Sequence, residues 1–342
     1  MRFLTELYPA VAARVKPPVC IPMGAPKSVA FLVQAMNLPD TTCYQMDLFP
    51  AARLRDDLTE MNATAEVVTA PDLWDLPQKF NTVLLPAGSH TDRELKLDLI
   101  EQGAHVLNPG GTFITLSEYE KDTEFAKLHK KMFGKCGQTP SSEAGMAFFS
   151  TKGDEPRERR RHEINFHAKV SGGPSMDFLT RPGVFSYGRM DSGTRALLEI
   201  AEVKDGDSLL DLGSGCGVVG CLMSTKAKLG KLTFIDSHLR ANAVCEINAK
   251  ANGVTNYEIV TSETMAGLPM NGFDVILANP PYYGDSMVAR LFVGSSRDLL
   301  KPGGKFYIVT KMPTAVVPII FESFGECDVI ENRGYSIVVA TV

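Results

Sequence analysis

The sequence predicts an α/β fold that is built twice along the chain, with a mostly parallel sheet in each half. Three observations support this prediction. Segments 193 positions apart repeat, short apolar runs alternate with helical patterns, and the 342 residues exceed what one ordinary core holds. We therefore expect two domains, residues 1–160 and residues 161–342.

The repeat is clearest in two pairs of segments. An apolar run beginning at Phe80 precedes a Pro-Gly-Gly turn at Pro109, and Phe273 and Pro302 stand in the same relation 193 positions later. Equal separations indicate one α/β unit that has been duplicated. Between the copies, residues 151–175 are polar and rich in Gly, Pro and Arg, which predicts a connector.

The second half begins with the order of a β-α-β unit. Residues 208–212 form an apolar run typical of a buried strand, and a glycine-rich loop at 213–217 leads into a helical pattern at 218–228. A second strand at 231–235 ends in Asp236, 25 residues beyond Asp211. In this Rossmann-like arrangement a cofactor that carries a nucleoside lies across the carboxyl ends of the strands, and the acid binds ribose hydroxyls.

Later segments complete the expected sheet. The patterns predict further strands at 258–260, 273–278 and 305–310, a helix at 288–300, and a closing hairpin from 326–330 and 335–341.

The spacing of the glycines decides which cofactor fits. Gly213, Gly215 and Gly217 are spaced Gly-x-Gly-x-Gly, whereas dinucleotide sites use Gly-x-Gly-x-x-Gly. Asp211, directly ahead of the loop, would repel a pyrophosphate but can accept from the ammonium of an amino-acid tail. S-adenosylmethionine has such a tail and no phosphate, so the sequence favours it over NAD. The expected cofactor contacts are Asp211, Gly213, Ser214, Gly215, Gly217, Asp236, Ser237, Glu263 and Asn279.

Among these, Glu263 has two interpretations. It lies in the run Thr-Ser-Glu-Thr at residues 261–264, which follows the third expected strand. The run fits a contact with the adenine amino group or, equally well, a helix N-cap.

Asn279, Pro280, Pro281 and Tyr282 follow the apolar run of residues 273–278 and predict a catalytic site for a planar amine. Such a nitrogen is a poor nucleophile because its lone pair is delocalised. The amide oxygen of Asn279 and the carbonyl of Pro280 can accept both of its N–H groups and turn it toward an electrophile, while the prolines fix φ. Tyr282 offers a stacking face worth about 1–3 kcal/mol per base. Together with the cofactor loop, these residues indicate methyl transfer.

The two copies differ where this chemistry would occur. In place of Asn-Pro-Pro-Tyr the first half has Pro-Ala-Gly-Ser at residues 86–89, which lacks the amide oxygen and the aromatic face. In place of the glycine loop it has Pro-Met-Gly-Ala-Pro at residues 22–26. Asp47 is assigned to the position of Asp236, at a separation of 189. We expect the first domain to keep the fold without the site and to serve structure or substrate recognition.

Composition and charge narrow the class of protein. With 44% hydrophobic residues and no apolar run near the roughly 20 residues of a membrane helix, we expect a cytoplasmic protein that does not bind membranes. A net charge of −5 argues against bulk coating of nucleic acid, although the basic run at 157–162 is either a local basic surface or a solvated linker. Seven cysteines without a Cys-x-x-Cys pair, and six histidines without ligand spacing, predict free thiols and no metal site.

Four motifs resemble those of bacterial ribosomal RNA guanine-N2 methyltransferases of the RsmC and RlmG type. They are Pro-Gly-Val-Phe-Ser at 182–186, Asp-Ser-Gly-Thr at 191–194, the loop at 211–217 and Asn-Pro-Pro-Tyr at 279–282. The resemblance covers most of residues 180–342 and, more faintly, residues 1–150.

The resemblance implies duplicated Rossmann-like methyltransferase domains. The second would be a seven-stranded, mostly parallel sheet that ends in an antiparallel hairpin. It further implies an enzyme that uses S-adenosylmethionine to methylate the exocyclic N2 amine of a guanine in ribosomal RNA, of the small subunit (16S). Gly213, Gly215 and Gly217 would line the cofactor, Asp236 would hold its ribose, and residues 279–282 would hold the guanine. The segment 185–191 would border the pocket, although Phe185 fits a core aromatic equally well. The expected partner is ribosomal RNA or an assembling ribosomal subunit, bound by a monomer.

The chain departs from the family pattern at two places. Tyr-Gly-Asp at residues 283–285 replaces a common His followed by Asp-Gly, and Lys311 stands where an Asn is frequent. The reaction class does not depend on these positions, whereas the choice of nucleotide does. Asp285 itself is either a proton acceptor or a helix N-cap.

Three other hypotheses remain open on the residues alone. The same site geometry serves methylation of a protein glutamine amide or of adenine N6, and a decayed, RNA-associated binding protein is the third. Asp285 and the acidic balance favour a protein substrate, while the basic run and the duplicated domain favour RNA.

Overall fold

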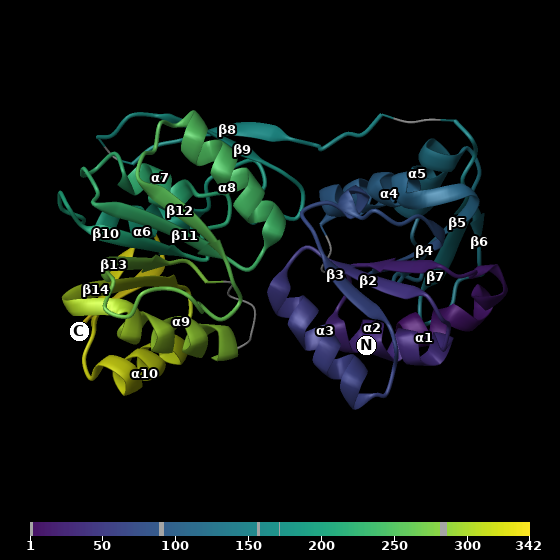
Figure 1. Ribbon diagram of the computed structural model, residues 1–342, viewed down its shortest axis with the longest axis horizontal. Helices are drawn as coiled ribbons and strands as arrows, with labels where there is room; N and C mark the ends of the chain where they lie inside the picture. Colours follow the sequence, from purple (N-terminus) through teal and green to yellow (C-terminus); the bar gives the residue numbers. More distant parts are fainter. Residues whose placement is uncertain (1–2, 89–91, 156–157, 171, 281–285) are drawn as a thin grey trace. The chain divides into compact units, whose positions relative to one another are not determined.

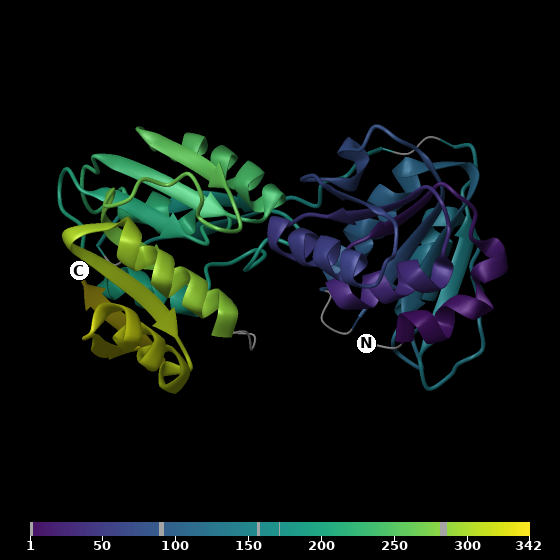
Figure 2. The same cartoon turned by 60° about the horizontal axis from the view of Figure 1, so that its bottom comes forward.

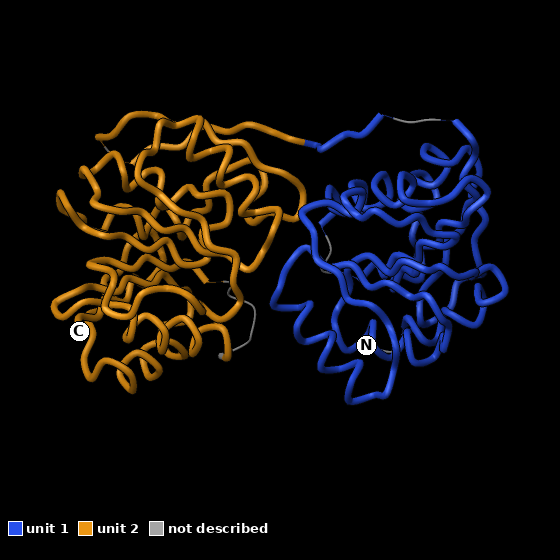
Figure 3. Tube along the Cα trace, in the orientation of Figure 1, with its two compact units in different colours: residues 1–162 blue, residues 163–342 orange. Residues whose placement is uncertain are grey.

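A computed structural model describes residues 3–88, 92–155, 158–170, 172–280 and 286–342. These residues divide into two compact units, Met1–His162 and Glu163–Val342, which Figure 3 distinguishes by colour. The predicted division stood between residues 160 and 161, and the roles assigned to the two domains stay predictions.

Both units contain a seven-stranded sheet with the same topology. The strand order is β3-β2-β1-β4-β5-β7-β6 in unit 1 and β12-β11-β10-β13-β14-β16-β15 in unit 2. In each sheet the first five strands are parallel, and the last two pair antiparallel. The predicted duplicated fold, with a terminal antiparallel hairpin in the second sheet, is therefore confirmed.

Unit 1 packs two layers of helices on its sheet. The strands are β1 (Val19–Pro22), β2 (Thr41–Gln45), β3 (Glu66–Thr69), β4 (Phe80–Ala87), β5 (Leu107–Ser117), β6 (Gly137–Gln138) and β7 (Met146–Thr151). The helices are α1 (Phe3–Leu7), α2 (Pro26–Met36), α3 (Leu48–Glu60), α4 (Arg93–Val106) and α5 (Glu124–Phe133), with short 3-10 turns η1 (Tyr8–Ala10), η2 (Ala12–Arg14) and η3 (Leu73–Asp75). Helices α1 to α3 share one apolar core with the sheet, and α4 and α5 share another.

Unit 2 repeats this plan. Its main strands are β10 (Ser208–Leu212), β11 (Lys231–Asp236), β12 (Tyr257–Thr261), β13 (Phe273–Ala278), β14 (Leu300–Thr310), β15 (Asp328–Asn332) and β16 (Tyr335–Thr341). Its helices are α6 (Ser192–Ile200), α7 (Val218–Met223), α8 (Leu239–Ala251), α9 (Ser286–Leu299) and α10 (Pro313–Phe324). Figure 1 shows α7 and α8 on one face of the sheet and α9 and α10 on the other, and the two resulting cores are separate. The turned view in Figure 2 shows α9 and α10 side by side.

Unit 2 also carries a small antiparallel sheet of β8 (Ile164–Ala168) and β9 (Met176–Thr180). The Asn248 side chain of α8 holds it, since Oδ1 accepts from Leu179 N at 2.8 Å and Nδ2 donates to Leu179 O at 2.9 Å. The prediction of a connector through residue 175 was wrong for β8, because the short alternation of Phe166 and Ala168 directly follows the charged run at 157–163.

Two bounds in unit 2 also differ from the prediction. Helix α7 ends at Met223, five residues before the predicted end, and a turn follows. The predicted turn at Pro302 lies within the irregular beginning of β14, where the register with β13 shifts.

The described cysteines are all free thiols, and those at positions 20, 43, 216, 221 and 245 are buried. In the described ranges, no helix is both long and apolar enough to cross a membrane. The same ranges contain no cluster of three or more metal-ligating side chains.

Candidate active site

The carboxyl ends of β10 and β13 meet because these neighbouring strands are parallel, with Leu212 opposite Ala278. The next residue on each strand, Gly213 and Asn279, therefore lies at the same edge of the sheet. A cavity opens there, and five residues predicted from the sequence line it: Asp211, Gly213, Ser214, Gly215 and Asn279.

The loop after β10 has a backbone that favours glycine. Gly213, Gly215 and Gly217 have φ angles of +75°, +54° and +83°. The amides of Gly213 and Ser214 both donate to Ile235 O, at 2.9 and 3.0 Å, which turns the chain back over the end of β11. A Cβ at Gly215 would have no heavy atom within 4 Å, so the backbone there faces open space.

Asp236 joins the glycine loop to the end of β11. Its Oδ2 accepts from Gly215 N at 2.8 Å, and its Oδ1 accepts from His238 N at 2.9 Å. A carboxylate has about four acceptor sites, so it can accept from more groups than these two amides. The half-buried Asp236 is not among the residues that line the cavity, and its ribose contact stays a prediction.

Asp211 is a buried carboxyl in the cavity wall. It is 2% exposed, and its Oδ2 accepts from Gly220 N in α7 at 2.9 Å. Burial, and to a smaller extent the nearby charge of Asp236, raise the pKa of Asp211 to about 7 against the lowering effect of the Gly220 hydrogen bond. A cation in the cavity would stabilise the ionised form.

Asn279 is fixed by the beginning of α6. Its Nδ2 donates to Thr194 Oγ1 at 2.9 Å and to Asp191 Oδ2 at 3.2 Å. Asp191 is also the N-cap of α6, where Oδ2 accepts from Thr194 N at 3.0 Å. The amide nitrogen of Asn279 therefore faces α6, and the amide oxygen lies at the other end of the amide group. This is the orientation that an amine-directing acceptor requires.

Ser214 supplies an independent sign of a ligand. Its hydroxyl is buried and has no hydrogen-bond partner among the described residues. Buried hydroxyls in folded proteins are nearly always paired. A polar group of a bound ligand would pair with this one, so the residues present fit a cofactor with a polar tail.

The other predicted site residues lie elsewhere. Gly217 is packed, since a Cβ there would lie 2.7 Å from Cys245 Sγ, and the half-buried Ser237 and Glu263 do not line the cavity. No helix follows Glu263 within residues 262–272, so the N-cap alternative was wrong. Pro280 is buried directly after Asn279. The predicted residues Pro281, Tyr282 and Asp285 lie outside the described residues.

The family resemblance implied that residues 185–191 border the pocket, whereas Thr194 and the contacts that hold Asn279 were missed. Asp191 and Thr194 line the cavity and hold Asn279, and Phe185 and Arg189 line it from the segment before α6. An Asp three residues before a Thr at the start of an apolar helical pattern signals an N-cap. That signal would have placed Asp191 at a helix start but not beside Asn279.

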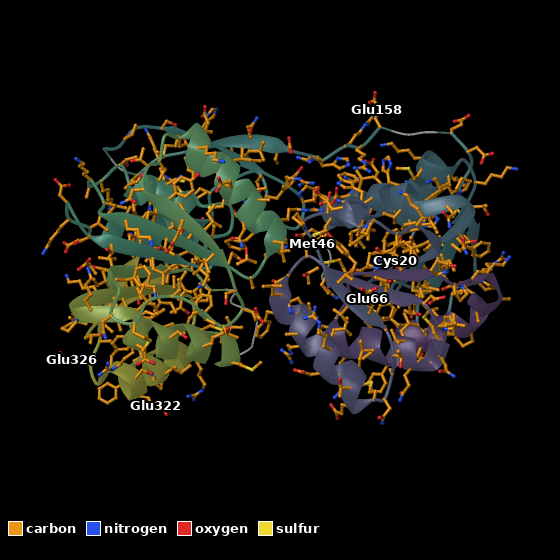
Figure 4. The ribbon with its side chains drawn as sticks, in the orientation of Figure 1. Cys20, Met46, Glu66, Glu158, Glu322 and Glu326 are labelled. Carbon is orange, nitrogen blue, oxygen red and sulfur yellow. The ribbon has the colours of Figure 1, made fainter. Side chains whose placement is uncertain are left out.

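Unit 1 shows how the equivalent place is closed. By strand register, Met23 and Pro86 correspond to Gly213 and Asn279. Pro86 packs on Gly24, the residue after Met23, since a Cβ at Gly24 would lie 3.1 Å from the proline ring. The fully buried Met46, labelled in Figure 4, follows β2.

The register also corrects one correspondence. Gln45, not Asp47, matches Asp236, because Gln45 pairs with Thr69 as Asp236 pairs with Thr261. Asp47 instead caps α3, at the position where His238 caps α8. Strand pairing places the equivalent residues of the two copies 191 positions apart at this strand, two more than the separation of 189. The first copy therefore also lacks a carboxylate at the position of Asp236.

Comparison with known proteins agrees with this geometry. The model of the methyltransferase small domain family matches residues 175–339. The ribosomal RNA small subunit methyltransferase C of Pseudomonas syringae pv. syringae is 30% identical over 177 residues, which are 50% of this chain and 52% of that protein. The ribosomal RNA large subunit methyltransferase G of Streptomyces avermitilis is 26% identical over 263 residues, 72% of this chain and 68% of that protein. The chain spans about half the length of the first curated relatives it matches.

One solved structure resembles the whole chain. It is the Thermus thermophilus 16S rRNA N2 methyltransferase RsmC in complex with AdoMet and guanosine, with a TM-score of 0.77 over 98% of this chain and 91% of that chain. At 20% identity the likeness concerns the fold, and it extends over both units.

Proposed function

We propose that this chain, whose residues 175–339 match the model of the methyltransferase small domain family, transfers a methyl group from S-adenosylmethionine to the exocyclic N2 amine of a guanine in small-subunit ribosomal RNA. The observation that carries the proposal is the meeting of a glycine loop and an immobilised Asn279 amide at one carboxyl edge. The second unit would be catalytic, and the first would serve structure or substrate recognition.

The cofactor would be held by the loop and by two carboxylates. Asp211 would accept from its ammonium, Asp236 would accept from its ribose hydroxyls, and the Ser214 hydroxyl would gain a partner in the bound tail. When bound, S-adenosylmethionine supplies an electrophilic methyl group on a cationic sulfur. The open space at Gly215 lets the backbone come close to the ligand.

The amine would be directed by Asn279 and Pro280. Their oxygens would accept its two N–H groups, so that the nitrogen lone pair faces the methyl group. Thr194 and Asp191 hold the Asn279 amide plane before substrate arrives, and such orientation can supply about 7–11 kcal/mol in favourable cases. A strong general base is unnecessary, because the amine proton becomes acidic as the new N–C bond forms.

RNA is favoured as the substrate class over the glutamine-amide and adenine alternatives. The matched relatives are named as ribosomal RNA methyltransferases, and the structure that shares the fold was solved with guanosine. We further propose that the enzyme acts in the bacterial cytoplasm as a monomer, on ribosomal RNA or on an assembling subunit.

The test is to supply labelled S-adenosylmethionine to ribosomal RNA, to assembled subunits and to total protein in parallel. Label in either RNA preparation supports the proposal, and a difference between them identifies the preferred form. Label in protein alone would replace it with the glutamine-amide hypothesis.

A further inference from the structure

Four basic side chains gather at the amino edge of the unit 1 sheet, opposite to the edge where an α/β fold places its ligands. We call Lys79, His105, Lys152 and Arg159 the amino-edge cluster. Lys79 Nζ donates to His105 O at 2.8 Å, and Lys152 Nζ donates to Leu107 O at 2.7 Å, where β5 begins.

The cluster is built around a buried aromatic ring. The Arg159 guanidinium lies 5.7 Å from the ring centre of Trp74, and the His105 ring meets the same indole edge-on at 5.7 Å. His105 Nε2 lies 3.3 Å from Glu158 O, which ties residues 158 and 159 to this edge. The segment that the sequence left open as a solvated linker therefore packs on unit 1 in part.

Positive charge in the cluster is not neutralised. Burial lowers the pKa of Lys152, and the charge of Lys79 lowers it further. Burial likewise lowers the pKa of His105, against the Glu158 backbone contact, and Arg159, Lys152 and Lys79 add to the lowering. Among the described residues, no carboxylate forms an ion pair with Lys79, Lys152 or Arg159.

Acidic residues also stand near the cluster, but they either pair with another residue or are exposed to solvent. Glu101 is paired with His162 at 2.7 Å, and the exposed Asp75 feels Arg159 and Arg161. The Glu158 side chain is exposed, and Figure 4 shows it directed outward from the ribbon. An anion would relieve the repulsion that remains.

The duplication provides an internal comparison. Positions 79, 105 and 152 correspond by register and backbone hydrogen bonds to Gly272, Asp298 and Val342 in unit 2. For example, Gly110 N donates to Lys152 O as Gly303 N donates to Val342 O. The second copy thus forms the same fold without these three basic residues. The fold does not require the cluster, so its charge calls for another explanation.

A groove adjoins the cluster at the same edge. Its cavity of about 760 Å³ is lined by the residues that precede β1 to β4, and Lys79 and Gln78 belong to its wall. The amide side chains of Gln34, Asn37 and Asn62 also line it, together with the acidic residues Asp40 and Glu66. Amides can bond to base edges, and the volume lies within the range of small-ligand sites. A single nucleotide fits such a groove, whereas a duplex does not enter it.

We propose that the amino edge of unit 1 binds an unpaired segment of the RNA substrate, with Lys79, Lys152 and Arg159 contacting phosphates and the adjoining groove receiving a base. This inference rests on RNA being the substrate class in the proposed function. It assigns the first copy a recognition surface in place of its lost catalytic site.

The test measures the affinity of the full chain for a labelled single-stranded RNA by fluorescence anisotropy across a salt series, without cofactor. The amino-edge variant combines Lys79→Gln, Lys152→Gln and Arg159→Gln. The matched control removes three exposed cations that follow the carboxyl ends of β1, β2 and β5 in the same sheet, through Lys27→Gln, Arg53→Gln and Lys121→Gln. Thermal unfolding monitors folding, and Arg159→Gln alone keeps the Lys152 hydrogen bond intact.

The amino-edge variant should lose at least about tenfold in RNA affinity near 0.1 M salt, and its salt slope should fall by about 2, at roughly 0.7 per lost phosphate contact. Arg159→Gln should give about a third of the slope change, and the control should stay near wild type. Equal losses in the two triple variants, or none in the amino-edge variant, would overturn the proposal.

Turnover separates this inference from the proposed function. The amino-edge variant should raise the KM for RNA and leave kcat and cofactor affinity unchanged. If RNA is methylated with an unchanged KM and salt slope, the surface is refuted and the proposed function stands. If no RNA is methylated but affinity falls as predicted, the surface stands and the proposed function fails.

Discussion

Asp236 offers the sharpest test of the cofactor site, because one side chain has two separable roles. In the structure its two oxygens accept from Gly215 N at 2.8 Å and from His238 N at 2.9 Å. In the proposal the same carboxylate also accepts from the cofactor ribose. Asp236→Ala therefore removes a ligand contact and loosens the glycine loop.

The expected magnitudes follow from hydrogen bonds to a charged group. The lost ribose contact should weaken S-adenosylmethionine binding by about 1.5–3 kcal/mol, or roughly 10- to 150-fold in Kd. The lost backbone contacts should lower the free energy of unfolding by about 2 kcal/mol, since water can reach the half-buried amides.

Calorimetric titration with S-adenosylmethionine and denaturant unfolding measure the two effects separately. Asp47→Ala is the matched control, because Asp47 Oδ1 accepts from Phe49 N at the same 2.9 Å but has no glycine loop to hold. It should lower stability by about 1 kcal/mol and leave cofactor affinity unchanged. A folded Asp236→Ala protein with wild-type affinity would refute the ribose assignment, and equal affinity losses in both variants would indicate general destabilisation.

Three further predictions follow from the site and from unit 1. Asn279→Ala should cut kcat by roughly 10²–10³ with little change in cofactor Kd. Thr194→Val removes the hydroxyl that fixes the Asn279 amide and should cut kcat by about tenfold. A loss of kcat that runs parallel to a loss of folding would contradict both predictions. Because burial raises the pKa of Asp211 to about 7, cofactor binding should strengthen as the pH rises through that value and the carboxylate forms, and Asp211→Asn should abolish this dependence in calorimetry. Burial lowers the pKa of His129 to about 4. As the pH falls from 6.5 to about 4, the unfolded chain therefore binds a proton at this histidine that the folded chain does not bind. Urea unfolding should then show a loss of about 3 kcal/mol across that window, and His129→Gln should flatten it; an unchanged pH profile in the variant would contradict this cause.

The fold could be predicted because its signals are local. Continuous apolar runs such as Val275 to Ala278 mark strands buried on both faces, and the Pro-Gly-Gly segments recur at a constant separation across α4–β5 and α9–β14. The loop glycines could be assigned because the tight loop requires positive φ angles, which glycine adopts more readily than other residues.

The parts that were missed depend on tertiary contacts. Asn279 bonds to Asp191 and Thr194 across 88 and 85 positions, and neither partner carries a local mark of that contact. The mistaken match of Asp47 to Asp236 arose because it paired two acids of the same residue type, whereas strand pairing identifies Gln45. The closure of unit 1 by Pro86 on Gly24 likewise appears only when two strands are side by side.

The central claim is that Asn279 directs a guanine N2 amine toward a methyl donor bound at the glycine loop. The most direct measurement is nucleoside analysis of ribosomal RNA incubated with labelled S-adenosylmethionine and either the wild-type chain or Asn279→Ala. The account predicts label in N2-methylguanosine with the wild type and its loss in the folded variant. Label in N6-methyladenosine, or equal N2-methylguanosine from both proteins, would contradict it.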